Sequence, residues 1–322
     1  MAIGTMFWRA THKCWYVKID GKFKRLSPDQ EDAEQLYRVL LVEHGTNEPT
    51  VADAVTMYLA WHQKTRAETS YVKKKAQLDT LVKLYGGMKA TDIEPQHIHN
   101  WVHMAFPNAG PTTVNDRMST VMGVWRWLAT NNKRVKNQIE GMEKPTCEMR
   151  EFFLTKDQWP RLLAACSKSA RPVIEFMLRT GARPQEASRV EISQWHEDHF
   201  QIQATKAKGK KRARQILVPS TLIPLIESQI GDRTSGHVFL NSRGKPWCKS
   251  SFNCVFRRLK VKLGWPELCA YTMRHSFAAD RVASGVHMEV VAKLLGHSTT
   301  AMVYKRYGHL DTQHELLRAA LG

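Results

Sequence analysis

LRTGARPQEASRV, residues 178–190, joins two segments of helical pattern through an arginine. The apolar run from Val173 to Leu178 predicts the end of a buried helix, and Gly181 stands where a helix C-terminal cap is expected. An arginine in such a joint costs packing and backbone freedom, so we expect it to hold something.

Pro184 suits the first position of a second helix over residues 185–192. Arg183 then lies just before a helix N-terminus, where unpaired N–H groups and the helix dipole favour an anion. A guanidinium beside that end would grip a phosphate, with Glu186 within reach to orient it. An ordinary Arg-Glu surface pair is the alternative interpretation of this stretch alone.

The composition favours a polyanionic partner. The 322 residues include 48 Lys plus Arg against 30 Asp plus Glu, a formal net charge of +18, and 43% are hydrophobic, enough for two or three small cores. Nucleic acid ranks ahead of an anionic membrane surface, because no apolar run has membrane-spanning length. The N-terminus lacks a signal-peptide pattern, so we expect a cytoplasmic protein, associated with the nucleoid when bound to DNA.

No metal site is expected. The six cysteines form no Cys-x-x-Cys pair and are typical of reduced thiols. His99 and His103 stand one helical turn apart, but no third ligand accompanies them, so a solvated helix face is favoured.

The first segment, residues 1–45, is predicted to be a small strand-helix module. Short strands FWRAT, CWYVKI and KFKRL precede a helix that opens at Ser27-Pro28, with Ser27 as its N-cap, and ends at Gly45.

Residues 46–135 show helical periodicity, and residues 136–150 are polar and aperiodic, which predicts a linker. One of the helices carries a run of lysines that could contact DNA, although such a run is usually a solvated face: Lys73, Lys74 and Lys75.

The last segment, residues 151–322, opens with a capping box at Thr155 and contains a hairpin of HFQIQAT and RQILVP. The cations between or at the base of these strands would reach DNA: Lys206, Lys208, Lys210, Lys211, Arg212 and Arg214. Helices are then expected over about 273–284, over 288–295 and from residue 298. They bring together Arg274, His275, His297, Tyr304 and Tyr307.

Taken in order, TGARPQE, the TK of the basic hairpin, MRH, LLGH and the tyrosine before GHL resemble the tyrosine recombinase (phage integrase) family. The resemblance covers about residues 150–310. It implies a mainly α fold with small β elements: a helical, SAM-like core-binding domain at 46–135, a linker at 136–150, and a mixed α/β catalytic domain at 151–322. Residues 1–45 are only loosely similar to an arm-type DNA-binding module.

The resemblance also implies roles. Arg183 and Arg274 would clamp the scissile phosphate, and His297 would hydrogen-bond it. Tyr307 would attack phosphorus, giving a 3′-phosphotyrosyl link, and Lys206 would protonate the leaving 5′ oxygen. Glu186 and His275 would support the site. Neither ATP, a metal nor another cofactor is required, because two transesterifications conserve the phosphodiester bond energy.

The chain departs from the family at Tyr271, where a histidine is usual. A phenol with a pKa of about 10 is a poor base but can still hydrogen-bond a phosphate. His275 is about a hundred degrees further round the helix than Arg274, so it does not simply replace Tyr271. Two alternatives stay open: Lys208 or Lys210 as the general acid, and Tyr304 as the nucleophile.

The sequence thus predicts a site-specific DNA recombinase, an integrase of a mobile element. Its expected partners are double-stranded attachment sites, further copies in a DNA-bound homotetramer, and accessory DNA-bending or directionality factors, with no membrane. The alternatives are a type IB topoisomerase-like strand transferase and a non-catalytic DNA-binding regulator derived from an integrase.

Overall fold

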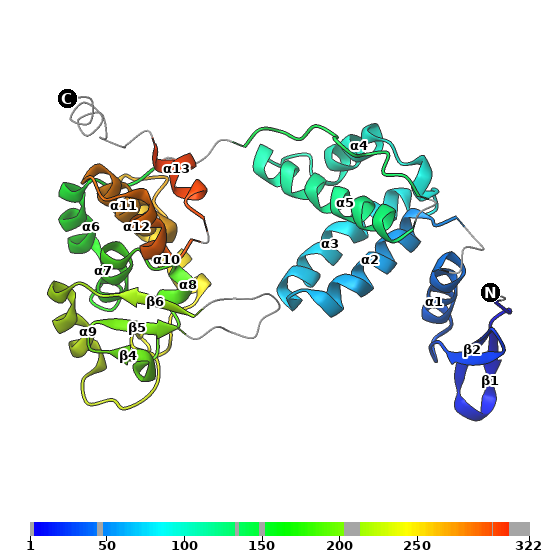
Figure 1. Ribbon diagram of the computed structural model, residues 1–322, viewed down its shortest axis with the longest axis horizontal. Helices are drawn as coiled ribbons and strands as arrows, with labels where there is room; N and C mark the ends of the chain where they lie inside the picture. Colours follow the sequence, from blue (N-terminus) through cyan, green and yellow to red (C-terminus); the bar gives the residue numbers. More distant parts are fainter. Residues whose placement is uncertain are drawn as a thin grey trace. The chain divides into compact units, whose positions relative to one another are not determined.

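The computed structural model describes residues 3–43, 48–132, 135–147, 152–202, 213–297 and 299–308. The chain divides into two compact units, Met1–Glu148 and Met149–Gly322, shown in Figure 1. Each unit builds its own hydrophobic core.

The first unit opens with an antiparallel sheet of order β1-β2-β3, as the sequence predicts. Its strands are β1 (Phe7–Arg9), β2 (Cys14–Ile19) and β3 (Lys22–Arg25), followed by helix α1 (Gln30–Glu43). Ser27 is not the N-cap that was expected, because α1 begins later: the Asp29 carboxylate accepts from the Asp32 N–H at 3.0 Å. The expected stop at Gly45 lies outside the described residues.

Four α-helices of the first unit are described between residues 51 and 131: α2 (Val51–Thr65), α3 (Glu68–Tyr85), α4 (Pro95–Ala105) and α5 (Pro111–Asn131). Trp101 and Trp125 are fully buried between them, and the Trp125 indole donates to the Ala90 carbonyl at 2.9 Å. His99 and His103 are exposed on α4, in agreement with the predicted solvated face.

The segment predicted to be a linker contributes to this core. Ile139 is fully buried and Met142 nearly so, and both pack with the helices of the first unit, which extends to residue 148. Sequence periodicity does not predict the burial of these two residues, because two isolated apolar side chains on irregular backbone form no periodic pattern.

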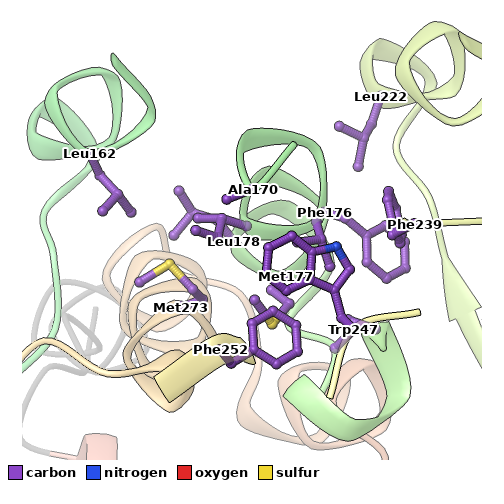
Figure 2. Packing of buried hydrophobic residues seen from close by; sticks show 14 of the residues in the cluster. Leu162, Ala170, Phe176, Met177, Leu178, Leu222, Phe239, Trp247, Phe252 and Met273 are labelled. Atoms are coloured by element: carbon purple, nitrogen blue, oxygen red, sulfur yellow. The ribbon is translucent and has the colours of Figure 1, made fainter. Parts of the chain in front are cut away.

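The second unit begins with the predicted capping box, in which the Thr155 N–H donates to the Gln158 side chain at 3.1 Å. Its longer helices up to residue 283 are α6 (Trp159–Ala165), α7 (Arg171–Thr180), α9 (Ile223–Ile230), α10 (Lys249–Leu263) and α11 (Ala270–Ala283). The core lies between α6, α7, α10 and α11, as Figure 2 shows for Leu162, Phe176, Met177, Phe252 and Met273.

Gly181 ends α7 in the left-handed conformation, with φ at 67°. A Cβ at this position would lie 2.5 Å from Phe277 and 2.9 Å from Leu295. Glycine is therefore required for two reasons: the backbone conformation, and the close approach of the Phe277 and Leu295 side chains. This turn directs the chain to Arg183.

The helix expected over residues 185–192 is a single turn, α8 (Pro184–Ala187). It ends early because Val190 is buried and its carbonyl accepts from the Val238 N–H at 3.0 Å, which needs extended backbone. So short a helix has little dipole, and the expectation of an anion at Arg183 must rest on the guanidinium.

A second antiparallel sheet follows, in the order β4-β5-β6. It consists of β4 (Trp195–His196), which the sequence did not reveal, and the predicted hairpin strands β5 (His199–Ile202) and β6 (Arg214–Leu217). Ile202 pairs with Arg214, so Arg214 lies at the first position of β6.

The unit closes with α12 (Met288–Leu295) and α13 (Ala301–Tyr307), which pack with α11 around a small cluster of their own. No helix in the described parts of the chain is long and apolar enough to cross a membrane.

Candidate active site

The site is built on the C-terminal end of α12. The carbonyls of a helix's last turn have no intrahelical donor and carry partial negative charge, so they attract cations. Here consecutive carbonyls accept from three arginines: Leu294 O from Arg214 Nη2 at 3.0 Å, Leu295 O from Arg274 Nη2 at 2.8 Å, and Gly296 O from Arg183 Nη2 at 3.3 Å.

Gly296 makes this arrangement possible. It ends α12 with φ at 64°, as the sequence predicts for a cap. A Cβ there would lie 2.8 Å from both Cδ and Nε of Arg214. Only glycine leaves room for that arginine.

Arg274 lies on α11 and is 5% exposed. Besides its bond to Leu295, it donates from Nη1 to the Gly181 carbonyl at 2.8 Å, which fixes the plane of the guanidinium. Burial, and then the charges of Arg183 and Arg214, lower its pKa to about 9. The side chain is therefore charged at neutral pH, in a site whose positive charges repel one another until an anion arrives.

His297 follows the cap and lies 2.9 Å through Nε2 from Arg274 Nη2. An arginine can only donate, so Nε2 accepts and the ring proton is on Nδ1. Nδ1 is buried and has no partner in the described part of the chain. Burial and the neighbouring arginines lower the pKa of His297 to about 4, so the ring is neutral.

Glu186 joins Arg183 to Arg214. Its carboxylate accepts from Arg183 Nη1 at 2.8 Å and from Arg214 Nη1 at 2.7 Å to each oxygen. It also accepts from the Arg183 backbone N–H at 2.8 Å, closing the turn of α8. The pairing of Arg183 with Glu186 that the sequence suggested is present, but it belongs to a larger cluster.

Tyr307, the last residue of α13, is 4% exposed. Its hydroxyl lies 2.6 Å from Nδ1 of His275 on α11. Burial raises the pKa of Tyr307 to about 12, although Arg306 and Arg274 oppose this. The phenol is consequently neutral in the free protein.

Arg306 on α13 also contacts this histidine: its Nη1 lies 2.7 Å from Nε2 and 3.2 Å from Nδ1 of His275. Burial and the charges of Arg306 and Arg274 lower the pKa of His275 to about 4. His275 is thus a neutral ring. Because Arg306 can only donate, Nε2 accepts from it in the free protein, and the ring proton lies on Nδ1, toward the Tyr307 hydroxyl. The sequence did not single out Arg306, because one arginine on a C-terminal turn is common.

The other two tyrosines that the sequence singled out, Tyr304 and Tyr271, are exposed to solvent. Tyr304 is 48% exposed on α13, and Tyr271 is 47% exposed at the start of α11, with its ring centroid 6.5 Å from that of His275. The structure therefore brings together Arg183, Glu186, Arg274, His275, His297 and Tyr307 and leaves Tyr304 outside.

Most of the predicted hairpin cations lie outside the described residues: Lys206, Lys208, Lys210, Lys211 and Arg212. Arg214 is described, and its side chain is only 13% exposed. The signal was present in the strand's alternation: Ile216 and Val218 are buried, and Arg214 has the same parity. The interpretation as part of a basic run concealed it.

The lysines of α3 have different surroundings from one another. Lys73 pairs with Asp116 at 2.7 Å and Lys75 with Asp79 at 3.1 Å, both at the surface. Lys74 is half-buried, with Nζ 5.9 Å from the ring of Tyr58, and burial lowers its pKa.

Curated relatives are similar to large parts of this chain. The integrase of Escherichia phage 186 is 29% identical over 210 residues, which cover 63% of this chain but only 58% of that protein's length. The tyrosine recombinase XerD of Vibrio cholerae is 24% identical over 310 residues, covering 89% of this chain and 94% of that protein.

Solved structures share the fold. A lambda integrase dimer bound to a COC′ core site aligns with a TM-score of 0.64 at 13% identity, covering 94% of each chain. The Tn1549 transposon integrase in complex with transposon right end DNA gives 0.66 at 16% identity, covering 80% of this chain and 94% of that one.

Two family profiles match along the chain. Residues 50–104 match the N-terminal SAM-like domain of phage integrases, in the helices of the first unit. Residues 152–314, half of the chain, match the phage integrase family itself and include the cluster of arginines, histidines and tyrosine described above. The chain belongs to the phage integrase family.

Proposed function

We propose that this protein is a site-specific DNA recombinase that cuts and rejoins DNA through a 3′-phosphotyrosyl intermediate. One observation carries the proposal. Two consecutive residues of α11 connect the arginine cluster to the tyrosine. Arg274 hydrogen-bonds to His297 in the cluster, and His275 hydrogen-bonds to the hydroxyl of Tyr307. A phosphate held by the cluster would lie near a tyrosine nucleophile.

The arginines would bind the scissile phosphate. Arg183 and Arg274 are each held by a carbonyl at the end of α12, so little reorganisation is needed when charge develops on the non-bridging oxygens. His297 has one donor, Nδ1–H, without a partner among the described residues. A phosphate oxygen would satisfy it once DNA binding uncovers that atom.

Tyr307 would attack phosphorus, with His275 as the proton acceptor. The Tyr307 oxygen bonds to phosphorus, and the bond from phosphorus to the 5′ oxygen breaks. The phenolic proton passes to His275 Nδ1 once Arg306 has left Nε2 and the ring carries its own proton there. Lys206 would give a proton to the leaving 5′ oxygen. The pKa values of about 12 and about 4 keep the proton on Tyr307 until the attack begins. His275 thereby takes the task for which Tyr271 is unsuited.

The partners follow from the same proposal. Solved relatives include a lambda integrase tetramer bound to a Holliday junction. For this chain we propose double-stranded attachment sites, a homotetramer on DNA, and accessory bending or directionality factors, all in the cytoplasm. Lys73 and Lys75 on the surface of α3 would contribute contacts to the DNA backbone.

Residues 1–45 would bind arm-type DNA. On the β1-β2-β3 sheet, the Arg9 guanidinium lies 4.8 Å from the ring centroid of Phe23 and 5.5 Å from that of Tyr16, and Lys18 Nζ lies 5.8 Å from Phe23. Cations held among aromatic rings on a narrow sheet suit phosphate contacts and insertion into a DNA groove.

Covalent attachment separates this proposal from its alternatives. The wild-type protein, Tyr307→Phe and Tyr304→Phe are incubated with labelled DNA flanking the protein's own gene, and the reaction is stopped with detergent. We expect an adduct in wild type and Tyr304→Phe, and none in Tyr307→Phe. Loss only in Tyr304→Phe would move the nucleophile by one turn of α13.

Specific binding by wild type without any adduct would instead favour a DNA-binding regulator. A type IB topoisomerase-like enzyme would form the adduct but would relax supercoiled DNA without joining two sites, so a two-site recombination assay on a plasmid completes the test.

A further inference from the structure

Arg214 has the setting of an active-site residue rather than of a hairpin cation. Its Nη1 donates to both oxygens of Glu186 at 2.7 Å, and its Nη2 donates to the Leu294 carbonyl at 3.0 Å. Both members of the pair are largely withdrawn from water, since the side chain of Arg214 is 13% exposed and that of Glu186 is 18% exposed. The bond is therefore only weakly screened by solvent and salt.

The fold makes room for this contact. The register of β6 places Arg214 opposite Ile202 and on the parity of buried Ile216, so the side chain enters the unit. The absence of a Cβ at Gly296 lets the guanidinium pass within 2.8 Å of where that atom would be.

Charge arithmetic shows what the contact achieves. In the cluster at the end of α12, Arg183, Arg214 and Arg274 contribute three positive charges and Glu186 one negative, a net charge of +2, and Arg306 lies apart from it, beside His275. Without Arg214 the net charge would be +1, and Glu186 would pair with Arg183 alone. A phosphodiester carries one negative charge, whereas its pentacoordinate transition state carries two, so a site of +2 favours the transition state over the substrate.

We propose that Arg214 is a positioning residue that neutralises Glu186 and so leaves the charge of Arg183 available to the phosphate. Glu186 can then fix the guanidinium of Arg183 without cancelling its charge. This inference rests on the recombinase function proposed above and assigns Arg214 to catalysis, not to DNA affinity.

The first test compares cleavage with binding. In single-turnover reactions on a nicked attachment-site substrate, Arg214→Met should slow covalent cleavage by about a hundredfold, the effect of removing one preorganised charge. Its Kd for the same DNA should stay within about threefold of wild type, because binding is spread over many phosphate contacts. Equal losses of cleavage and affinity would make Arg214 a DNA-backbone contact and overturn the proposal.

Restoring the net charge of the site distinguishes a charge-balancing role from a merely structural one, because only the former predicts recovery of the cleavage rate. In the double variant Arg214→Met with Glu186→Gln, the site regains a net charge of +2 from Arg183 and Arg274. We expect cleavage to recover at least about tenfold over Arg214→Met alone, a coupling well above that of independent sites. If Arg214 acted only through packing, the double variant would be as slow as the single one or slower.

A neutral substrate gives an independent test. Replacing one non-bridging oxygen of the scissile phosphate by methyl removes the charge that the site must balance. The deficit of Arg214→Met relative to wild type should shrink to less than about tenfold on this methylphosphonate. A deficit as large as on the ordinary phosphodiester would contradict a charge-balancing role.

A second arginine-glutamate pair in the same unit provides the matched control. Arg179 and Glu175 pair at 3.2 Å on α7, outside the site. Arg179→Met, alone and with Glu175→Gln, should cleave at the wild-type rate. If wild type itself forms no adduct, the proposed function fails; if wild type cleaves and Arg214→Met matches Arg179→Met, only the inference about Arg214 fails.

Discussion

The lysines of α3 and the arginines around the end of α12 have the same charge in opposite settings. The side chain of Lys73 is 59% exposed and pairs with Asp116 at the surface. Arg274 is buried and is held by the carbonyls of Gly181 and Leu295. Exposed ion pairs contribute about 0–1 kcal/mol, whereas a hydrogen bond to a charged group contributes about 1.5–3 kcal/mol, and Arg274 makes several of them.

The difference separates affinity from chemistry. A surface lysine is a mobile point charge that can move to any nearby phosphate, and its neighbours can substitute for it. A buried arginine is fixed by several acceptors, so its position relative to a reacting phosphorus is defined before DNA arrives. We therefore expect substitutions in the two regions to affect different measurements.

The largest effect is expected at Arg274. Arg274→Lys keeps the charge but cannot reach Gly181, Leu295 and His297 together, since an ammonium has no planar fork. Single-turnover cleavage should fall by about a thousandfold, the upper range for one preorganised donor. DNA affinity, measured by anisotropy, should change little. Lys73→Arg is the reciprocal control, and cleavage by Arg274→Lys within about tenfold of wild type would erase the distinction between the regions.

The next effect is expected at His275. His275→Gln removes the residue that we propose as the proton acceptor for Tyr307, and cleavage should slow by about a hundredfold, the lower range for general base catalysis. Wild-type cleavage should show no inflection at the usual histidine pKa near 6.5, because the pKa of His275 is lowered to about 4. A rate that follows a group titrating near 6.5 would argue against His275.

The same histidine makes the fold sensitive to acid. Its pKa is lower in the folded than in the unfolded chain, so unfolding takes up a proton between pH 6.5 and 4. The stability contribution is complete above pH 6.5 and is lost as the pH falls through 4. The drop in Tm from pH 7 to pH 4.5 should be smaller in His275→Gln, while His297, whose pKa is lowered to a similar value, maintains part of it.

A smaller effect is expected at Gly296. Gly296→Ala adds a Cβ in the left-handed conformation and displaces Arg214. We expect about tenfold slower cleavage and a loss of about 1–2 kcal/mol of stability from the backbone strain. Gly264→Ala isolates that strain, because Gly264 has φ at 71° and a Cβ added there would meet nothing within 4 Å. Equal cleavage by both alanine variants would show that the approach of Arg214 is unimportant.

The smallest effect is expected in α3. Lys73→Met and Lys75→Met should each weaken DNA binding a few-fold and reduce the slope of log K against log salt by about one. Stability should change by less than about 0.5 kcal/mol, and cleavage at saturating protein should be unaltered. A large loss of cleavage would mean that the surface lysines also organise the site.

The motifs allowed most of the residues in this cluster to be predicted as neighbours, because each lies beside a local structural signal. Gly181 and Gly296 mark helix ends, and these place Arg183 and His297. The buried position of Arg214 could not be predicted in the same way. It depends on which face of β6 the side chain occupies and on a hydrogen bond to the Leu294 carbonyl, 80 residues away.

The contact between His275 and Tyr307 also escaped, because helical angles within α11 say nothing about where α13 crosses it. The fold was predictable where periodicity was strong, as in α5 and α7. It was not where one tertiary contact overrides the local pattern, as at Val190, which ends α8 early, or at Ile139 in the expected linker.

The three successive carbonyls at the end of α12 make the positions of three arginine side chains depend on one helix. A displacement of α12 would move the carbonyls that hold Arg183, Arg214 and Arg274, and so would shift all three guanidiniums together. The chain also continues from Gly296 into α13, the helix of Tyr307, within a few residues. Under the proposed recombinase function, we therefore expect any movement of α12 to change the positions of the three guanidiniums together and not one by one.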